Sequence, residues 1–293
     1  MKKSFHMGLA AMLLLAASCT SSKSPMKLDI REYADSSAYS YFNMHVEMPV
    51  AKGTVPSAIR NVLVDVMDEA LSHVSDNEGR EFGRFEGDPG DSEALFSYYE
   101  VQASTALAEA SDRDCGDRIL GIYESKTLSD SEKEFYAANI SRWAYDFNLK
   151  KVEETKDYIV FDSQNYVSYG GAHGGIIGAG PMTFSKKDGH LVREFFRPDC
   201  TKDMQKLLRE GLQEYFQFRM DAVGLGLGAF LSLPEDSLIP LPGWAPYPVA
   251  DSLHFVYQQY EIAAYAAGMP EFSLPYDKVR KYLTDDARKT IGR

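Results

Sequence analysis

Hydrophobic and polar residues alternate with a period of two along several stretches of this chain. Between Tyr41 and Met48, the apolar side chains at 42, 44, 46 and 48 alternate with tyrosine or polar ones. The same alternation occupies residues 143–149, and the stretch DYIVFDSQNYVSY at 157–169 continues it. Because successive side chains of a strand point to opposite faces, the pattern predicts strands with one buried face. An aromatic stretch at 252–268 predicts a last strand.

A different spacing follows the first predicted strand. Apolar residues from Val55 to Val74 recur three and four positions apart, which is the spacing of one face of an α-helix. Thr54 precedes them and is the expected N-cap. Acidic residues fall between the apolar positions, so the solvated face of this helix is expected to carry Asp65, Asp68 and Glu69.

The remaining segments complete an α+β pattern. Further helices are expected at 92–110, at 201–219 and after Pro275, with a hairpin at 182–196 that turns at Lys187–Gly189. The glycine- and proline-rich stretch 223–249 predicts a long irregular excursion. Helices and strands occur in blocks rather than in strict alternation, which predicts an α+β fold of antiparallel sheets packed with amphipathic helices. We expect two α+β subdomains, at 38–140 and 141–293.

The N-terminus is typical of an exported protein. Lys2 and Lys3 precede a short apolar run at 8–17, which predicts a secretory signal peptide at residues 1–18. The sequence LLLAASCTSS resembles a bacterial lipoprotein signal, with Cys19 as the acylated residue and 19–37 as a tether. An ordinary signal peptide with an incidental cysteine is the alternative. The expected location is the cell envelope, on its periplasmic or cell-surface face, and no other stretch is long and apolar enough to span a bilayer.

The net charge limits the classes of binding partner, and the cysteine content bears on disulfide formation. The formal net charge is −12 at pH 7, which argues against nucleic acid and anionic lipid surfaces and favours cationic partners, unless it serves solubility alone. Apart from Cys19, the cysteines are Cys115 and Cys200. An oxidising compartment permits a disulfide between them, but their spacing does not establish that they meet.

The glycine-rich stretch YVSYGGAHGGIIGAGPM at 166–182 is the most unusual feature of the sequence. A dinucleotide site needs G-x-G-x-x-G directly before a helix, whereas these glycines precede a predicted hairpin. The sequence also has no G-x-S-x-G elbow, no H-E-x-x-H pair and no cysteine and histidine ligand cluster. No metal and no cofactor are therefore expected.

His173, in the middle of this stretch, has two interpretations. As an exposed loop residue with a near-neutral pKa, it would suit acid–base work. As a structural residue, it would hydrogen-bond backbone groups at a tight glycine corner. Because no carboxylate or nucleophile stands beside it in sequence, the structural interpretation is favoured.

Two motifs in order give a family resemblance: GGAH, residues Gly170, Gly171, Ala172 and His173, and YEIAAYAAG, which begins with Tyr260 and Glu261. Together with KKDGHLVREFF between them, they resemble the C-terminal domain of unknown function shared by RsiV-type anti-sigma factors, which include a lysozyme receptor, and PdaC-type peptidoglycan deacetylases. The resemblance covers residues 143–283. Residues from about 39 resemble, more weakly, the smaller domain that often precedes it.

The resemblance implies an α+β fold and transfers no catalytic residue. The leading hypothesis is a non-enzymatic, lipid-anchored envelope protein that binds a cell-wall-associated ligand, such as a cationic lysozyme-like protein or peptidoglycan. Trp244 and Tyr247, expected to be exposed among prolines, would supply aromatic contacts, unless the excursion packs over the core with Trp244 as its plug.

The alternative is an envelope enzyme acting on wall polymers or peptides. In that case His173 would be the base, and folding would bring an acid near it. The candidate acids are Asp162, Glu194 and Glu261. A purely structural envelope component remains a third hypothesis.

Overall fold

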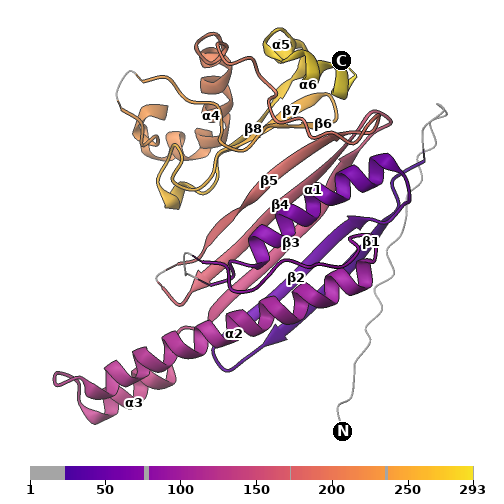
Figure 1. Ribbon diagram of the computed structural model, residues 1–293. Helices are drawn as coiled ribbons and strands as arrows, with labels where there is room; N and C mark the ends of the chain where they lie inside the picture. The colour runs from indigo at the N-terminus through magenta and orange to yellow at the C-terminus, as the bar shows by residue number, and fades with distance from the viewer. Residues whose placement is uncertain (1–23, 76–78, 172, 235–236, 293) are drawn as a thin grey trace, which may run out of the picture.

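The computed structural model describes residues 24–75, 79–171, 173–234 and 237–292. A five-stranded sheet in the order β1-β2-β3-β4-β5 forms its centre, as Figure 1 shows. The β2–β3 pair is parallel and the other pairs are antiparallel. The strands are β1 (Leu28–Ser36), β2 (Ser40–Pro49), β3 (Trp143–Glu154), β4 (Tyr158–Tyr169) and β5 (Gly175–Ser185). The predicted α+β class is confirmed, while Cys19, the signal peptide and Ala172 lie outside the described residues.

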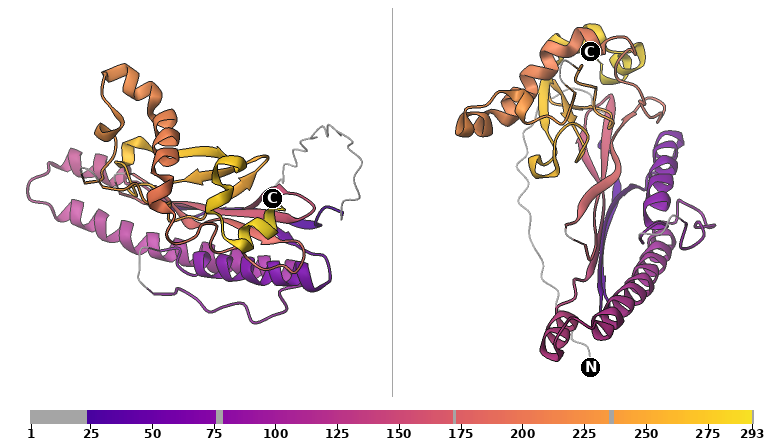
Figure 2. Two further views of the ribbon diagram at one scale, coloured as in Figure 1. Left: turned by 90° about the horizontal axis from the view of Figure 1, so that it is seen from above. Right: turned by 90° about the vertical axis from the view of Figure 1, so that its left-hand side faces the viewer.

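Two helices cover one face of this sheet (Figures 1 and 2). They are α1 (Thr54–Leu71) and α2 (Ser92–Glu124), and α3 (Asp130–Ala138) folds back beside the end of α2. The alternating apolar residues of β2, from Phe42 to Met48, are buried beneath the helices with Tyr145 and Phe147 of β3. The period-two pattern of the sequence therefore set which face of the strands the helices cover.

A C-terminal unit packs on the opposite face, over β4 and β5 (Figure 2). Helix α4 (Thr201–Val223) lies against a three-stranded antiparallel sheet, β6-β7-β8. Gly211 of α4 allows this packing, because a Cβ there would lie 2.2 Å from the Phe272 ring. The remaining elements are β6 (Tyr247–Val249), β7 (Ser252–Val256), β8 (Glu271–Pro275), α5 (Tyr276–Val279), α6 (Asp285–Ile291) and the 3₁₀ turns η1 (Leu227–Ala229), η2 (Tyr265–Ala267) and η3 (Arg280–Tyr282).

Strand β4 is buried on both faces where the C-terminal unit covers it. Tyr158 and Val160 belong to the hydrophobic cluster of that unit, whereas Ile159 and Phe161 belong to the cluster beneath α1 and α2. A strand covered on both faces reads as a continuous apolar run, which accounts for the sequence YIVF. This strand therefore joins the two hydrophobic clusters.

Several sequence predictions need correction. Thr54 is the first residue of α1 and makes no side-chain cap; the N-cap is Gly53. Residues 28–36, expected in the tether, form β1, because pairing with β2 compensates for a weak apolar pattern. Helix α2 continues from the predicted end at 110 to Glu124. The turn at Lys187–Gly189 forms, but the returning strand is reduced to one bridge, between Phe184 and Leu191.

The predicted boundary at 140/141 lies in the connection between α3 and β3. Strands β2 and β3, from its two sides, are hydrogen-bonded neighbours in one sheet. One hydrophobic cluster likewise takes residues from both sides, from Phe42 to Phe184. Sequence periodicity identifies each strand but carries no information about its pairing partner.

The two described cysteines do not form the disulfide that the sequence left open. Both thiols are free and buried. Cys115 belongs to the cluster beneath the helices and Cys200 to the cluster of the C-terminal unit. Burial raises the pKa of each thiol, which disfavours the reactive thiolate. Among the helices of the described residues, none is long and apolar enough to cross a membrane.

Candidate functional site

The two motifs of the sequence resemblance lie in contact. The β4–β5 connection, with His173 and Gly174, meets the segment 258–268 that follows β7. The Tyr265 hydroxyl donates to the Gly174 carbonyl at 2.7 Å, and the Ile176 amide donates to Gln259 Oε1 at 2.9 Å. The His173 ring stacks on Tyr265, with ring centroids 4.0 Å apart and planes 23° apart. Residues ninety positions apart in sequence thus form one surface.

Gly170 and Gly171, the first residues of the GGAH motif, lie at the end of β4. Gly170 has a positive φ of 72°, which favours glycine, and its carbonyl accepts a hydrogen bond from Arg118 Nη2 at 3.3 Å. Gly171 is exposed. Gly170 thus turns the chain out of β4 and ties it to α2.

His173 is exposed, and its Nδ1 lies 3.3 Å from the Gly174 carbonyl. Among the described residues, no carboxylate oxygen lies within 4.0 Å of its ring. Asp162 is buried against the C-terminal unit, and burial raises its pKa. Glu194 is exposed, and its main-chain carbonyl accepts from Thr284 Oγ1 at 2.8 Å. The fold therefore does not assemble the acid–base pair of the enzyme hypothesis.

The Glu261 carboxylate holds the backbone of its own loop. Oε1 accepts the Gly243 amide at 2.6 Å, and Oε2 accepts the Gln258 amide at 2.7 Å. Charge-assisted hydrogen bonds of this kind are about twice as strong as neutral ones. Glu261 thus joins the segment 258–268 to the proline-rich excursion.

Trp244, for which the sequence left an exposed anchor and a buried plug both open, is buried, with 6% of its surface exposed. Its Nε1 donates to the Gly178 carbonyl of β5 at 3.1 Å. Tyr247 is half-buried and packs edge-on against His254, and burial, followed by the charges of Asp162 and Glu271, raises its pKa to about 12. The excursion is thus packed onto the edge of β5, with Trp244 as its plug.

A cleft of about 830 Å³ lies between α1 and β5. One wall is α1, where Asp65 and Glu69 lie one turn apart on one face, together with His73 in the turn that follows the helix. Tyr145 and Asn165 lie at the floor, and Asn165 Nδ2 is a buried donor without a hydrogen-bond partner among the described residues. The opposite wall is formed by residues 177–179, 181 and 182 of β5, residues 191–193 and residues 243–245.

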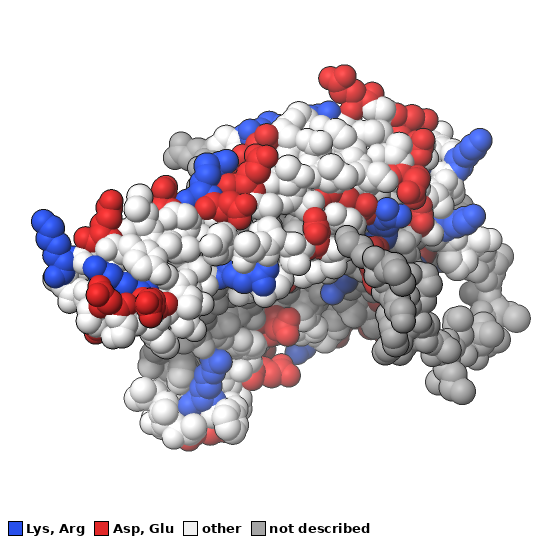
Figure 3. Space-filling model, turned by 90° about the horizontal axis from the view of Figure 1, so that it is seen from below, with Lys and Arg blue, Asp and Glu red and all other residues white. Residues whose placement is uncertain are grey.

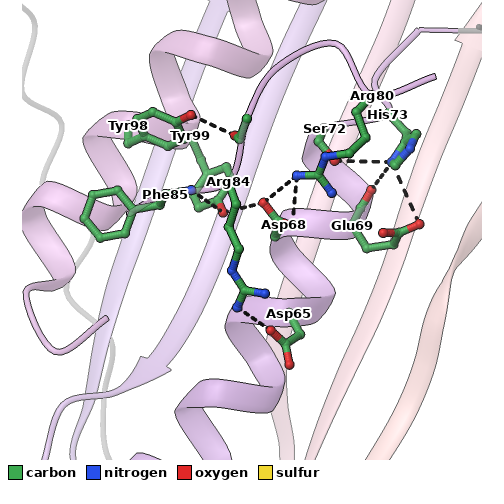
Figure 4. Close-up of polar contacts among 11 residues, drawn as sticks. Asp65, Asp68, Glu69, Ser72, His73, Arg80, Arg84, Phe85, Tyr98 and Tyr99 are labelled. Atoms are coloured by element: carbon green, nitrogen blue, oxygen red, sulfur yellow. Dashed lines mark hydrogen bonds and ion pairs between the residues drawn. The ribbon is translucent and has the colours of Figure 1, made fainter. Parts of the chain in front are cut away.

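A network of ion pairs supports this acidic wall, as Figure 4 shows. Asp68 is only 5% exposed and accepts from Arg80 Nη2 at 3.0 Å and from the Tyr99 hydroxyl at 2.7 Å. The expectation that Asp68 lies on a solvated face is therefore wrong, because the chain after α1 returns to cover it. Asp65 pairs with Arg84, and Glu69 is exposed. Sequence reasoning missed this network, whose partners come from residues 80–99.

Figure 3 shows acidic side chains on one face of the molecule interspersed with lysine and arginine. The net charge of −12 is therefore not gathered into a single patch on that face. Among the described residues, no three histidine, cysteine, aspartate or glutamate side chains are placed to hold a metal ion. The described groups offer a cleft and an exposed aromatic loop for binding.

Comparisons with known proteins support the fold. Residues 245–277 match the model of a family described as protein of unknown function, DUF3298. A crystal structure of a DUF3298 family protein from Bacteroides fragilis NCTC 9343 is similar, with a TM-score of 0.58 and 13% identity over 93% of this chain and all of that one. Another, from Pseudomonas aeruginosa PAO1, has a TM-score of 0.51 and 12% identity over 90% of this chain and 95% of that one. No curated protein matches the chain.

Proposed function

We infer that this chain is an exported, lipid-anchored envelope protein that binds a cell-wall-associated ligand without catalysing a reaction. Its C-terminal part would belong to the RsiV/PdaC type of domain. The DUF3298 match at 245–277 supports a domain of unknown function at this position. The favoured ligand is a cationic protein of lysozyme type, with peptidoglycan fragments as the second candidate.

The observation that carries the proposal is the acidic wall of the cleft between α1 and β5. Glu69 is exposed on this wall, and Asp65, which is paired with Arg84, stands one turn before it. The apolar side chains Val62 and Val66 lie beside them, so this wall combines an apolar surface with the negative charge of Glu69, while Arg193 lies on the opposite wall. Such a surface favours a partner with basic side chains, and the net charge of −12 favours its encounter.

The enzyme alternative finds less support. It requires an acid near His173, but Glu261 is bonded to main-chain amides and Asp162 is buried against the C-terminal unit. Measured hydrolysis of wall polymers that disappears in the variant His173→Gln would revive it.

Calorimetric titration of the full chain with a lysozyme and with soluble muropeptides tests the proposal. We expect saturable binding of the lysozyme that weakens as salt is raised, because salt screens exposed charges. The variant Glu69→Gln should weaken it by about two- to fivefold, the range for exposed ion pairs. Glu134→Gln, an exposed acid on α3, is the matched control and should leave it unchanged. Absence of binding to both ligands would overturn the proposal.

The anchor needs its own experiment. Cells that express the chain should incorporate radiolabelled fatty acid into it, and the variant Cys19→Ser should lose the label. A label that persists in this variant would exclude Cys19 as the acylated residue.

A further inference from the structure

Three aromatic rings form a ladder at the contact between the two motifs: Tyr260, Tyr265 and His173. His173 stacks on Tyr265 at 4.0 Å, and the Tyr260 ring lies 5.6 Å from Tyr265, with 36° between their planes. Tyr260 is 63% exposed, and His173 is exposed at the other end. The ladder therefore presents aromatic surface to solvent at both of its ends.

Tyr260 holds an unfavourable backbone conformation. Its φ is 65°, in the left-handed region, which a bulky side chain rarely adopts because its Cβ approaches the carbonyl oxygen. The backbone on either side is fixed, since the Gln258 amide is bonded to Glu261, and Ile262 is buried. A ring exposed this far gains little from burial. Burial of the ring therefore does not offset the backbone strain of tyrosine, rather than glycine, at residue 260. This strain points to a role of the ring in binding.

The polar groups beside the ladder select the class of ligand. Glu261 is the only acidic residue of the segment 258–268, and both of its carboxylate oxygens accept main-chain amides. A cation on the ladder would therefore have no carboxylate of this segment available to it. The two residues before Tyr260 in the chain are Gln258 and Gln259, and Gln259 Oε1 accepts the Ile176 amide at 2.9 Å. Amides donate to and accept from hydroxyl groups, which suits an uncharged, hydroxyl-rich molecule.

We propose that the ladder of Tyr260, Tyr265 and His173 is a stacking platform for the pyranose rings of a neutral glycan. The C–H groups on one face of a pyranose carry partial positive charge and are attracted to the negative face of an aromatic ring. This site is separate from the acidic cleft, and it rests on the proposed function only for the source of the glycan, the cell wall.

The test is titration of the full chain with a β-1,4-linked N-acetylglucosamine oligomer, followed by saturation-transfer NMR and calorimetry. We expect saturable binding that does not change with salt, because the ligand is uncharged. Binding of a lysozyme to the cleft should weaken with salt, so the two proposals fail independently. Oligolysine serves as the cationic comparison.

The decisive variant is Tyr260→Gly. Glycine accepts the left-handed conformation, so the Tm should rise by about 2–4 °C while affinity for the oligomer falls at least about tenfold. Tyr260→Trp should retain binding, and Phe218→Ala, at an exposed phenylalanine of α4, should change neither quantity. A lower Tm with unchanged glycan binding in Tyr260→Gly would assign the ring a structural role. That result, a wild-type chain that binds no oligomer, or a ladder that binds oligolysine instead would overturn the proposal.

Discussion

Trp244 lies directly against Gly180, so that a Cβ at residue 180 would be 2.5 Å from the indole ring. Gly180 also has a positive φ of 67°. These two facts explain why residue 180 of β5 is glycine. Gly180 thus lies in the surface on which the proline-rich excursion docks.

Replacing Gly180 should therefore loosen that docking. We expect Gly180→Ala to lower the free energy of unfolding by about 2–3 kcal/mol, from the clash and the strained φ together. Gly171→Ala is the matched control, because no atom lies within 4 Å of a Cβ there and its φ is not positive. Chemical denaturation measures the free energy of unfolding of both variants. Equal effects of the two substitutions would contradict the docking role.

Asp68 should stabilise the protein far more than its neighbour Asp65. Asp68→Asn removes a buried charge bonded to Arg80 and Tyr99, and we expect a loss of about 2–4 kcal/mol. Asp65→Asn breaks an exposed pair with Arg84 and should cost about 1 kcal/mol or less. Thermal and denaturant unfolding of the two variants check the difference. The reverse order would show that Asp68 is solvated in solution.

His190 should make stability depend on pH. Burial lowers its pKa, but hydrogen bonds and charges of Asp188 and Asp286 outweigh burial, so its pKa in the folded state is raised. His190 Nδ1 lies 2.7 Å from Asp188 Oδ1, and its Nε2 lies 2.8 Å from Asp286 Oδ1. The second contact ties the turn after β5 to α6. The contribution of the two contacts is complete below the ordinary histidine pKa of about 6.5 and is lost as pH rises through the higher folded value.

The Tm should accordingly fall as pH rises above about 6.5, and His190→Gln should flatten that part of the profile. The effect should be small, since the His190 side chain is 40% exposed. On the acid side, bonds from His190 lower the pKa of Asp188 to about 2, so the contribution of Asp188 is lost as pH falls toward that value. A Tm profile that His190→Gln leaves unchanged would contradict this linkage.

The thiols of Cys115 and Cys200 should react only when the chain unfolds. Both are free and buried, and burial raises their pKa values. In a Cys19→Ser background, a thiol reagent should label neither residue quickly in the native protein and both in denaturant. A mass that corresponds to an internal disulfide would contradict this arrangement.

Local patterns predicted the elements with good accuracy where burial is one-sided. The strand at 41–48 and the helices beginning near 54, 92 and 201 are all present. Local patterns do not predict burial that depends on a distant segment. For Trp244 the surrounding prolines left an exposed anchor and a buried plug both open, and only its packing against β5 decides between them. Asp68 was expected to be solvated because it is charged, yet Arg80 and Tyr99 surround it.

The candidate site was partly visible in the sequence. GGAH and YEIAAYAAG were paired as an identifying signature, but nothing local indicated that Tyr265 would bond to Gly174. The left-handed φ of Tyr260 could not be predicted from the sequence either, because tyrosine rarely adopts that conformation. The sequence by itself determined the periodicities, the class of fold and the composition of the loops, because these depend on neighbouring residues. Only the tertiary structure decided which loops meet, which charges are buried and which rings face solvent, because these depend on contacts between residues far apart in the chain.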